Sequence, residues 1–261
     1  MVDTRNVSNR RKHEIGDQRD GDRGIVVEVH RPGTSRGIDR YVRSRWYAGD
    51  LAAAQAVWRH PGIVEAAGSF VLLTYFASPG LLAVRAPDVG GSLRTAVDGH
   101  RERSFLEGIV GFGVDDSTRG GIGNPAVRRR VERLRDRHLE YPGMTEAYMS
   151  LVAGLLAIAP LRLHAHYGEL VTAAVAARYW HYIRRVMRML APDLGGPGST
   201  ARRCGRLVEA GAGPSAAGRE LILEFSQRHP EHVARAVPIL FPAARQVVQQ
   251  ALAVLGESAW R

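Results

Sequence analysis

The sequence has little of several residue types, and each shortage excludes a class of protein. Cys204 is the only cysteine among 261 residues. A single chain can therefore form no disulfide within itself and no cysteine-based zinc or iron–sulfur centre. Lys12 is the only lysine, so arginine supplies nearly all of a formal net charge of +10. So uniform a preference indicates a compositional habit of the source genome, and we discount it as a signal for nucleic acid.

Long apolar runs are also lacking. The two most apolar stretches, residues 62–84 and 149–171, are interrupted by charged residues and by Pro79 and Pro160. A membrane-spanning helix needs about 20 consecutive apolar residues, so neither stretch meets that requirement. The first 24 residues are polar and carry no apolar signal-peptide core. We therefore expect a soluble, cytoplasmic protein with no membrane span.

What the sequence does contain is helical periodicity. We predict a flexible polar tail over residues 1–40, where residues 25–29 alternate as a strand would, and one all-α domain of nine or ten helices over residues 41–261. Helices are expected over residues 51–60, 62–78, 101–112, 126–140, 144–159, 170–190, 216–229 and 244–257. Asp50 is expected to cap the first of these. Residues 195–200, rich in Gly, Pro and Ser, are the best candidate for an internal linker.

The helix over residues 126–140 is the most informative. Asn124 followed by Pro125 is a strong helix start. Val127, Val131 and Leu134 then form an apolar stripe that ends at His138, while arginines and acidic residues occupy the other side. An imidazole buried beside apolar side chains needs a carbonyl, a carboxylate or a metal as its partner. The pattern by itself favours a hydrogen-bonded core histidine, and it also suits an axial haem ligand.

Other candidate motifs are weaker. His164 and His166 are two residues apart and point in different directions from a helix, so we expect one in the core or a cap and one in solvent. His181 is expected to be structural or exposed. The glycine-rich segments 111–113 and 120–123 lack the strand–turn–helix context of a dinucleotide site. No G-x-S-x-G motif is present, which argues against a serine hydrolase.

Taken in order, several short segments resemble a known family. They are LTYFASP at residues 73–79, VGFG at 110–113, PAVR at 125–128, RLRDRHLEYP at 133–142, PLR at 160–162, HYG at 166–168 and YW…RVM at 179–187. This order resembles the haem-dependent oxygenase superfamily of the mycophenolic-acid pathway oxygenase (MpaB) and the rubber oxygenase latex clearing protein. The likeness covers roughly half of the chain, from about residue 73 to residue 192.

The resemblance implies a globin-like helical domain that encloses haem b. His138 would be the proximal ligand to the iron, with Arg135 and Tyr141 as its neighbours in the cofactor site. The implied reaction is activation of O2 and oxidative cleavage of a carbon–carbon double bond in an isoprenoid or natural-product intermediate, the substrate being a small apolar molecule.

The chain departs from the family pattern on the distal side. The distal lysine of the rubber oxygenases is absent, and Arg184 replaces a glycine that usually precedes the arginine–methionine pair. Arg101, Arg103 and Ser104 match the distal arginine–threonine segment as candidate catalytic residues, with Thr95 as an alternative for the threonine.

Two alternatives remain from the sequence. One is an all-α nucleic-acid-binding or ligand-responsive regulatory protein, suggested by the charge but without a helix-turn-helix pattern. The other is a haem-binding family member with altered catalysis.

Overall fold

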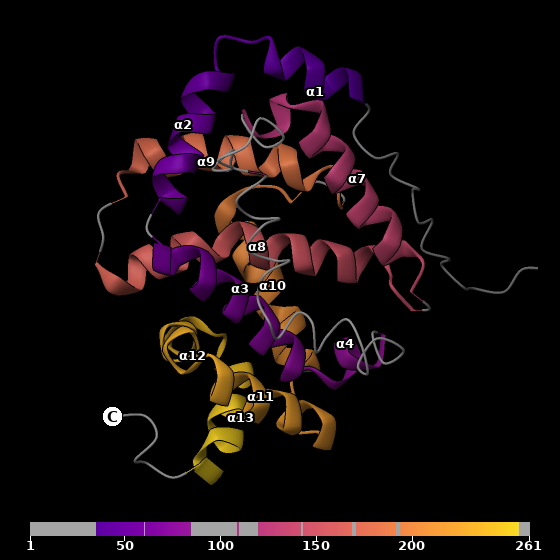
Figure 1. Ribbon diagram of the computed structural model, residues 1–261, viewed down its shortest axis with the longest axis vertical. Helices are drawn as coiled ribbons and strands as arrows, with labels where there is room; N and C mark the ends of the chain where they lie inside the picture. The colour runs from indigo at the N-terminus through magenta and orange to yellow at the C-terminus, as the bar shows by residue number, and fades with distance from the viewer. Residues whose placement is uncertain are drawn as a thin grey trace, which may run out of the picture. The chain divides into compact units, whose positions relative to one another are not determined.

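The described part of the chain is entirely helical (Figure 1). The computed structural model describes residues 35–59, 61–84, 109, 120–141, 143–168, 171–191 and 194–255. Within these ranges no β-strand occurs, which confirms the all-α prediction. The expected strand at residues 25–29 and the expected helix at residues 101–112 lie outside the described residues, apart from Ile109.

The elements follow one another with short connections. The helices are α1 (Ser35–Val42), α2 (Tyr47–Trp58), α3 (Pro61–Phe76), α4 (Pro79–Val84), α7 (Pro125–Leu139), α8 (Glu146–Tyr167), α9 (Ala173–Met187), α10 (Pro197–Gly211), α11 (Ala216–Arg228), α12 (Pro230–Ala236) and α13 (Pro242–Leu252). Short 3-10 turns are η2 (Gly121–Gly123), η3 (Val237–Ile239) and η4 (Ala253–Leu255).

Helix α8 forms the centre of the core. It packs against α3, α9 and α10, and its buried side chains include Leu151, Leu155 and Leu163. By length and composition α8 could cross a membrane, but 67% of its most apolar window is buried inside the protein, as in the core helix of a soluble fold. Its apolar character is therefore explained by packing.

Helix α8 also corrects a predicted boundary. We expected a helix to end at residue 159, before Pro160, whereas α8 continues through that proline to Tyr167. Proline removes one backbone donor, so it usually bends or ends a helix. Here Pro160 is buried within the α8 packing, and that tertiary contact outweighs the local cost.

Close helix contacts depend on two small residues. At Gly154 of α8 an added methyl group would lie 2.6 Å from Sγ of Cys204 on α10. At Gly218 of α11 it would lie 2.2 Å from the carbonyl oxygen of Phe76 at the end of α3. Both glycines are therefore required by the distance between neighbouring helices.

Three further predictions at element boundaries need correction. Helix α1 begins at Ser35, within the expected tail, because Ile38 packs into the core and Asp39 pairs with Arg128 of α7. The expected linker at residues 195–200 instead begins α10: Pro197 occupies its first turn, and the buried Thr200 hydroxyl bonds to the Leu194 carbonyl at 2.6 Å. Asp50 caps no helix, since α2 already begins at Tyr47.

Candidate functional site

Helix α7 is built as its sequence predicts. The Asn124 side chain accepts a hydrogen bond from the backbone N–H of Ala126, and Pro125 occupies the first turn. Val127 and Val131 are buried, and Leu134 packs against the core one turn later. His138 lies next on this stripe and is half-buried. The helix therefore delivers an imidazole to the end of an apolar face.

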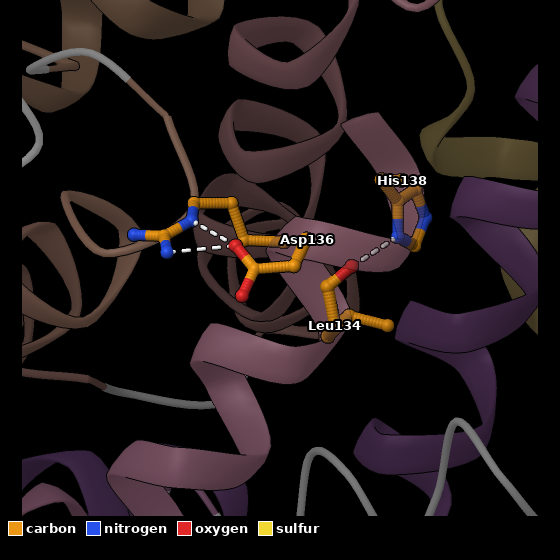
Figure 2. Close-up of polar contacts among 4 residues, drawn as sticks. Leu134, Asp136 and His138 are labelled. Atoms are coloured by element: carbon orange, nitrogen blue, oxygen red, sulfur yellow. Dashed lines mark hydrogen bonds and ion pairs between the residues drawn. The ribbon is translucent and has the colours of Figure 1, made fainter. Parts of the chain in front are cut away.

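The ring of His138 is held by its own helix. Nδ1 lies 2.8 Å from the carbonyl oxygen of Leu134 (Figure 2). Because a carbonyl can only accept, Nδ1 carries the proton, and the lone pair of the neutral ring is on Nε2. The Tyr141 ring meets the imidazole edge-on, with the ring centroids 6.0 Å apart at 85°. Orientation of one ring nitrogen by a carbonyl is the arrangement found around metal-ligating histidines.

Arg135 is not brought to His138. Its Nε and Nη2 donate to Oδ1 of Asp136 at 2.9 and 2.7 Å, and the Asp136 side chain is 59% exposed. Figure 2 shows Asp136 and His138 on opposite sides of the helix. Of the residues expected at the cofactor, His138 and Tyr141 lie together, whereas Arg135 points to the arginine-rich outer face.

The expected distal residues cannot be placed. Arg101, Arg103, Ser104 and the alternative Thr95 all lie outside the described residues.

The histidine pair of α8 behaves as expected. His164 is buried, and its Nε2 donates to the carbonyl of Val57 at 2.8 Å. His166 is exposed and lies edge-on to Tyr167. The two rings therefore do not share a ligand. Among the described residues no group of three or more His, Cys, Asp or Glu side chains could hold a metal ion.

A polar cluster between α1, α2 and α9 was not predicted. The buried carboxylate of Asp50 accepts the Tyr41 hydroxyl at 2.9 Å and the Nδ1–H of His181 through Oδ2. The Arg185 guanidinium stacks 4.2 Å from the centre of the Tyr41 ring. Burial, with the neighbouring carboxylate, raises the pKa of Tyr41 well above its usual value, so its hydroxyl stays protonated as the donor.

No signal in the sequence joined these residues, because Asp50 and His181 are 131 positions apart. A hint lay in the position of Asp50 within an alanine-rich helix, where an inward-facing carboxylate needs a buried partner.

A second unpredicted cluster surrounds the glycine-rich turn before α7. The Tyr182 hydroxyl accepts from the Ile122 N–H at 3.1 Å and donates to the Ile109 carbonyl. The Tyr47 hydroxyl accepts from the Gly123 N–H at 2.7 Å. Gly121 has φ +55, and a side chain there would collide with the Tyr182 hydroxyl. The glycines thus give the turn its shape and set the start of α7, rather than binding phosphate.

Two hollows occur elsewhere in the described structure. One of about 540 Å³ lies between α11 and α13, with Ile222, Val247 and Ala251 among its lining residues. Another of about 190 Å³ lies between α4, α8 and α10 and includes Tyr148 and Leu207. Neither is lined by His138 or His181.

Comparison of the chain with protein-family models, with curated proteins and with solved structures finds no match. The functional argument therefore rests on the residues themselves.

Proposed function

We propose that this chain is a haem b-dependent oxygenase that uses His138 as the axial ligand and acts on a small apolar molecule in the cytoplasm. Oxidative cleavage of a carbon–carbon double bond in an isoprenoid or natural-product intermediate is the reaction that the resemblance to the MpaB and latex clearing protein superfamily suggests. The single observation that carries the proposal is the tautomer of His138, set by the 2.8 Å contact between Nδ1 and the Leu134 carbonyl.

The donor chemistry at His138 fits a haem. An axial ligand must be a neutral imidazole with its lone pair directed away from its own backbone, beside apolar surface. His138 ends the stripe of Val127, Val131 and Leu134, and its Nδ1 proton is committed to the helix. One protein ligand suffices for haem, so the lack of a three-residue metal cluster among the described residues does not bear on this proposal.

The chain's own residues would have three tasks. The Leu134 carbonyl fixes the rotation of the imidazole and increases its basicity at Nε2. Tyr141 limits movement of the ring by its edge contact. The apolar stripe of α7 would exclude water from the ligand. Haem, when bound, supplies the iron at which O2 is activated.

The test is haem content. The protein is expressed with a haem precursor, and the porphyrin is identified by pyridine extraction. We expect about one haem b per chain, with loss of haem in His138→Ala and unchanged helical content by circular dichroism. His166→Ala, which removes an exposed histidine from α8, is the matched control and should retain haem.

Two outcomes would contradict the proposal. Stoichiometric haem in His138→Ala would show that another residue is the ligand. A colourless protein that also fails to take up added hemin would remove the oxygenase hypothesis and favour the regulatory or nucleic-acid alternative. Steeply salt-dependent retention on DNA would then be the next measurement.

A further inference from the structure

The Asp50–His181 pair is a second histidine centre, separate from His138. Asp50 is buried on α2, and its Oδ2 accepts both the Tyr41 hydroxyl and the Nδ1–H of His181. The His181 side chain is nevertheless 43% exposed. One edge of the imidazole is therefore fixed in the interior while the ring itself reaches solvent.

This geometry prepares the imidazole to react. Because Nδ1 keeps its proton on the carboxylate, the lone pair is on Nε2. A carboxylate behind the ring also makes Nε2 more basic and stabilises positive charge that develops on the ring. The Tyr41 ring stands edge-on to the imidazole, with centroids 5.7 Å apart, and limits its rotation. A merely structural histidine needs no such arrangement at a partly exposed position.

Two arginines flank His181 on α9. Arg178 and Arg185 are three residues before and four residues after it, which places both on the same helix face. The Arg178 guanidinium lies over Gly49, where an added methyl group would be 2.6 Å from its Nη1, so it is next to Asp50 in α2. Arg185 donates to the His181 carbonyl at 2.6 Å and stacks on Tyr41. An anionic reagent would thus meet positive charge on both sides of the imidazole.

We propose that His181 is a phosphoryl acceptor, modified at Nε2 by an acyl phosphate or phosphoramidate donor. The Nε2 lone pair forms the N–P bond as the bond from phosphorus to the leaving group breaks, and that electron pair departs with the leaving group. The Nδ1 proton stays on the Asp50 hydrogen bond, whose negative charge offsets the charge on the ring. Asp50 is a positioning residue here, and Arg178 attracts the dianionic donor. This inference is independent of haem binding.

The experiment uses the full chain and potassium phosphoramidate, followed by peptide mass mapping under conditions that preserve phosphohistidine. His166 is the internal reference, since it is exposed and has no carboxylate partner in the described part of the chain. We expect His181 to be phosphorylated at least about tenfold faster than His166, and Asp50→Asn to remove most of that advantage. His181→Gln should lose this modification and remain folded.

A neutral reagent separates phosphoryl acceptance from general reactivity. Arg178→Gln should slow phosphorylation of His181 by about three- to fivefold, as should high salt, and leave its reaction with diethylpyrocarbonate unchanged. Equal rates at His181 and His166 would overturn the proposal. So would an advantage for His181 that is the same with the neutral reagent as with phosphoramidate, because the arginines would then have no part in selecting the donor.

Discussion

Gly218 is the residue at which one added methyl group has the clearest consequence. Its backbone faces the end of α3, and a methyl group would lie 2.2 Å from the Phe76 carbonyl oxygen and 2.7 Å from the Ser215 hydroxyl. A carbonyl in the backbone cannot move aside as a flexible side chain can. The cost of an alanine therefore has to be met by separating α11 from α3.

We expect Gly218→Ala to lower the free energy of unfolding by about 3 kcal/mol, the upper range for overpacked sites. Gly68→Ala is the matched control, because Gly68 is also helical but has no atom within 4 Å of the added methyl. That change should stabilise the protein by about 0.5–1 kcal/mol. Urea titrations of both variants measure the difference, and equal effects would show that the α11–α3 contact is looser than described.

His232 gives a pH dependence at the scale of one side chain. Burial lowers its pKa, an effect that nearby His229 and Arg235 reinforce and that Glu65 and Glu231 oppose. The folded protein therefore binds a proton at His232 less readily than the unfolded chain does. Its contribution to stability is complete above the unfolded pKa of about 6.5 and is lost as the pH falls through the folded value.

We expect His232→Gln to lose less stability between pH 7.5 and pH 5 than the parent protein does. Chemical denaturation at a series of pH values provides the measurement. If the two curves run parallel across this range, His232 is not responsible for any acid destabilisation of the fold.

At the scale of the element, α7 depends on how it begins. Asn124 accepts the Ala126 N–H at 2.9 Å, which satisfies one of the donors left unbonded at the helix start. Asn124→Ala should reduce the free energy of unfolding by about 1 kcal/mol, whereas Asn124→Ser should retain most of the stability because serine also caps. Thermal unfolding followed by circular dichroism compares the two. A serine variant as unstable as the alanine variant would mean that the cap hydrogen bond is not what matters.

Local signals explain which elements could be predicted from the sequence. Asn124 and Pro125, and the stripe ending at His138, predicted a helix over residues 126–140, and α7 spans Pro125–Leu139. The start of α3 at Pro61 and most of α11 were likewise predicted from local pattern.

Elements fixed by distant contacts could not be predicted in this way. Helix α10 was hidden by its Gly- and Pro-rich start, which is held by Thr200 and by packing against α8. The cluster around Asp50 joins residues from three helices, and no spacing in the chain announces it. At the candidate haem site the stripe ending at His138 was predictable, while the commitment of Arg135 to Asp136 required the structure.

At the scale of the whole molecule, α8 connects the packing of α3, α9 and α10. Leu155 is fully buried at its centre. We expect Leu155→Ala to lower the free energy of unfolding by about 2–5 kcal/mol, and tryptophan fluorescence and circular dichroism to report one shared transition. Val152→Ala, one turn earlier and only partly buried, should cost less. Separate transitions by the two probes would show that the helices around α8 unfold independently.

The contact between Gly154 and Cys204 provides a built-in gauge of local opening. Cys204 is the only thiol in the chain; it is fully buried, and burial raises its pKa to about 11. A thiol reagent can therefore react only while α10 is separated from α8, since the closed state neither exposes nor ionises the sulfur. The labelling rate, divided by the rate for the unfolded chain, gives the fraction of time that this interface spends open. One absorbance trace, without any engineered probe, thus times the breathing of the protein's central helix pair.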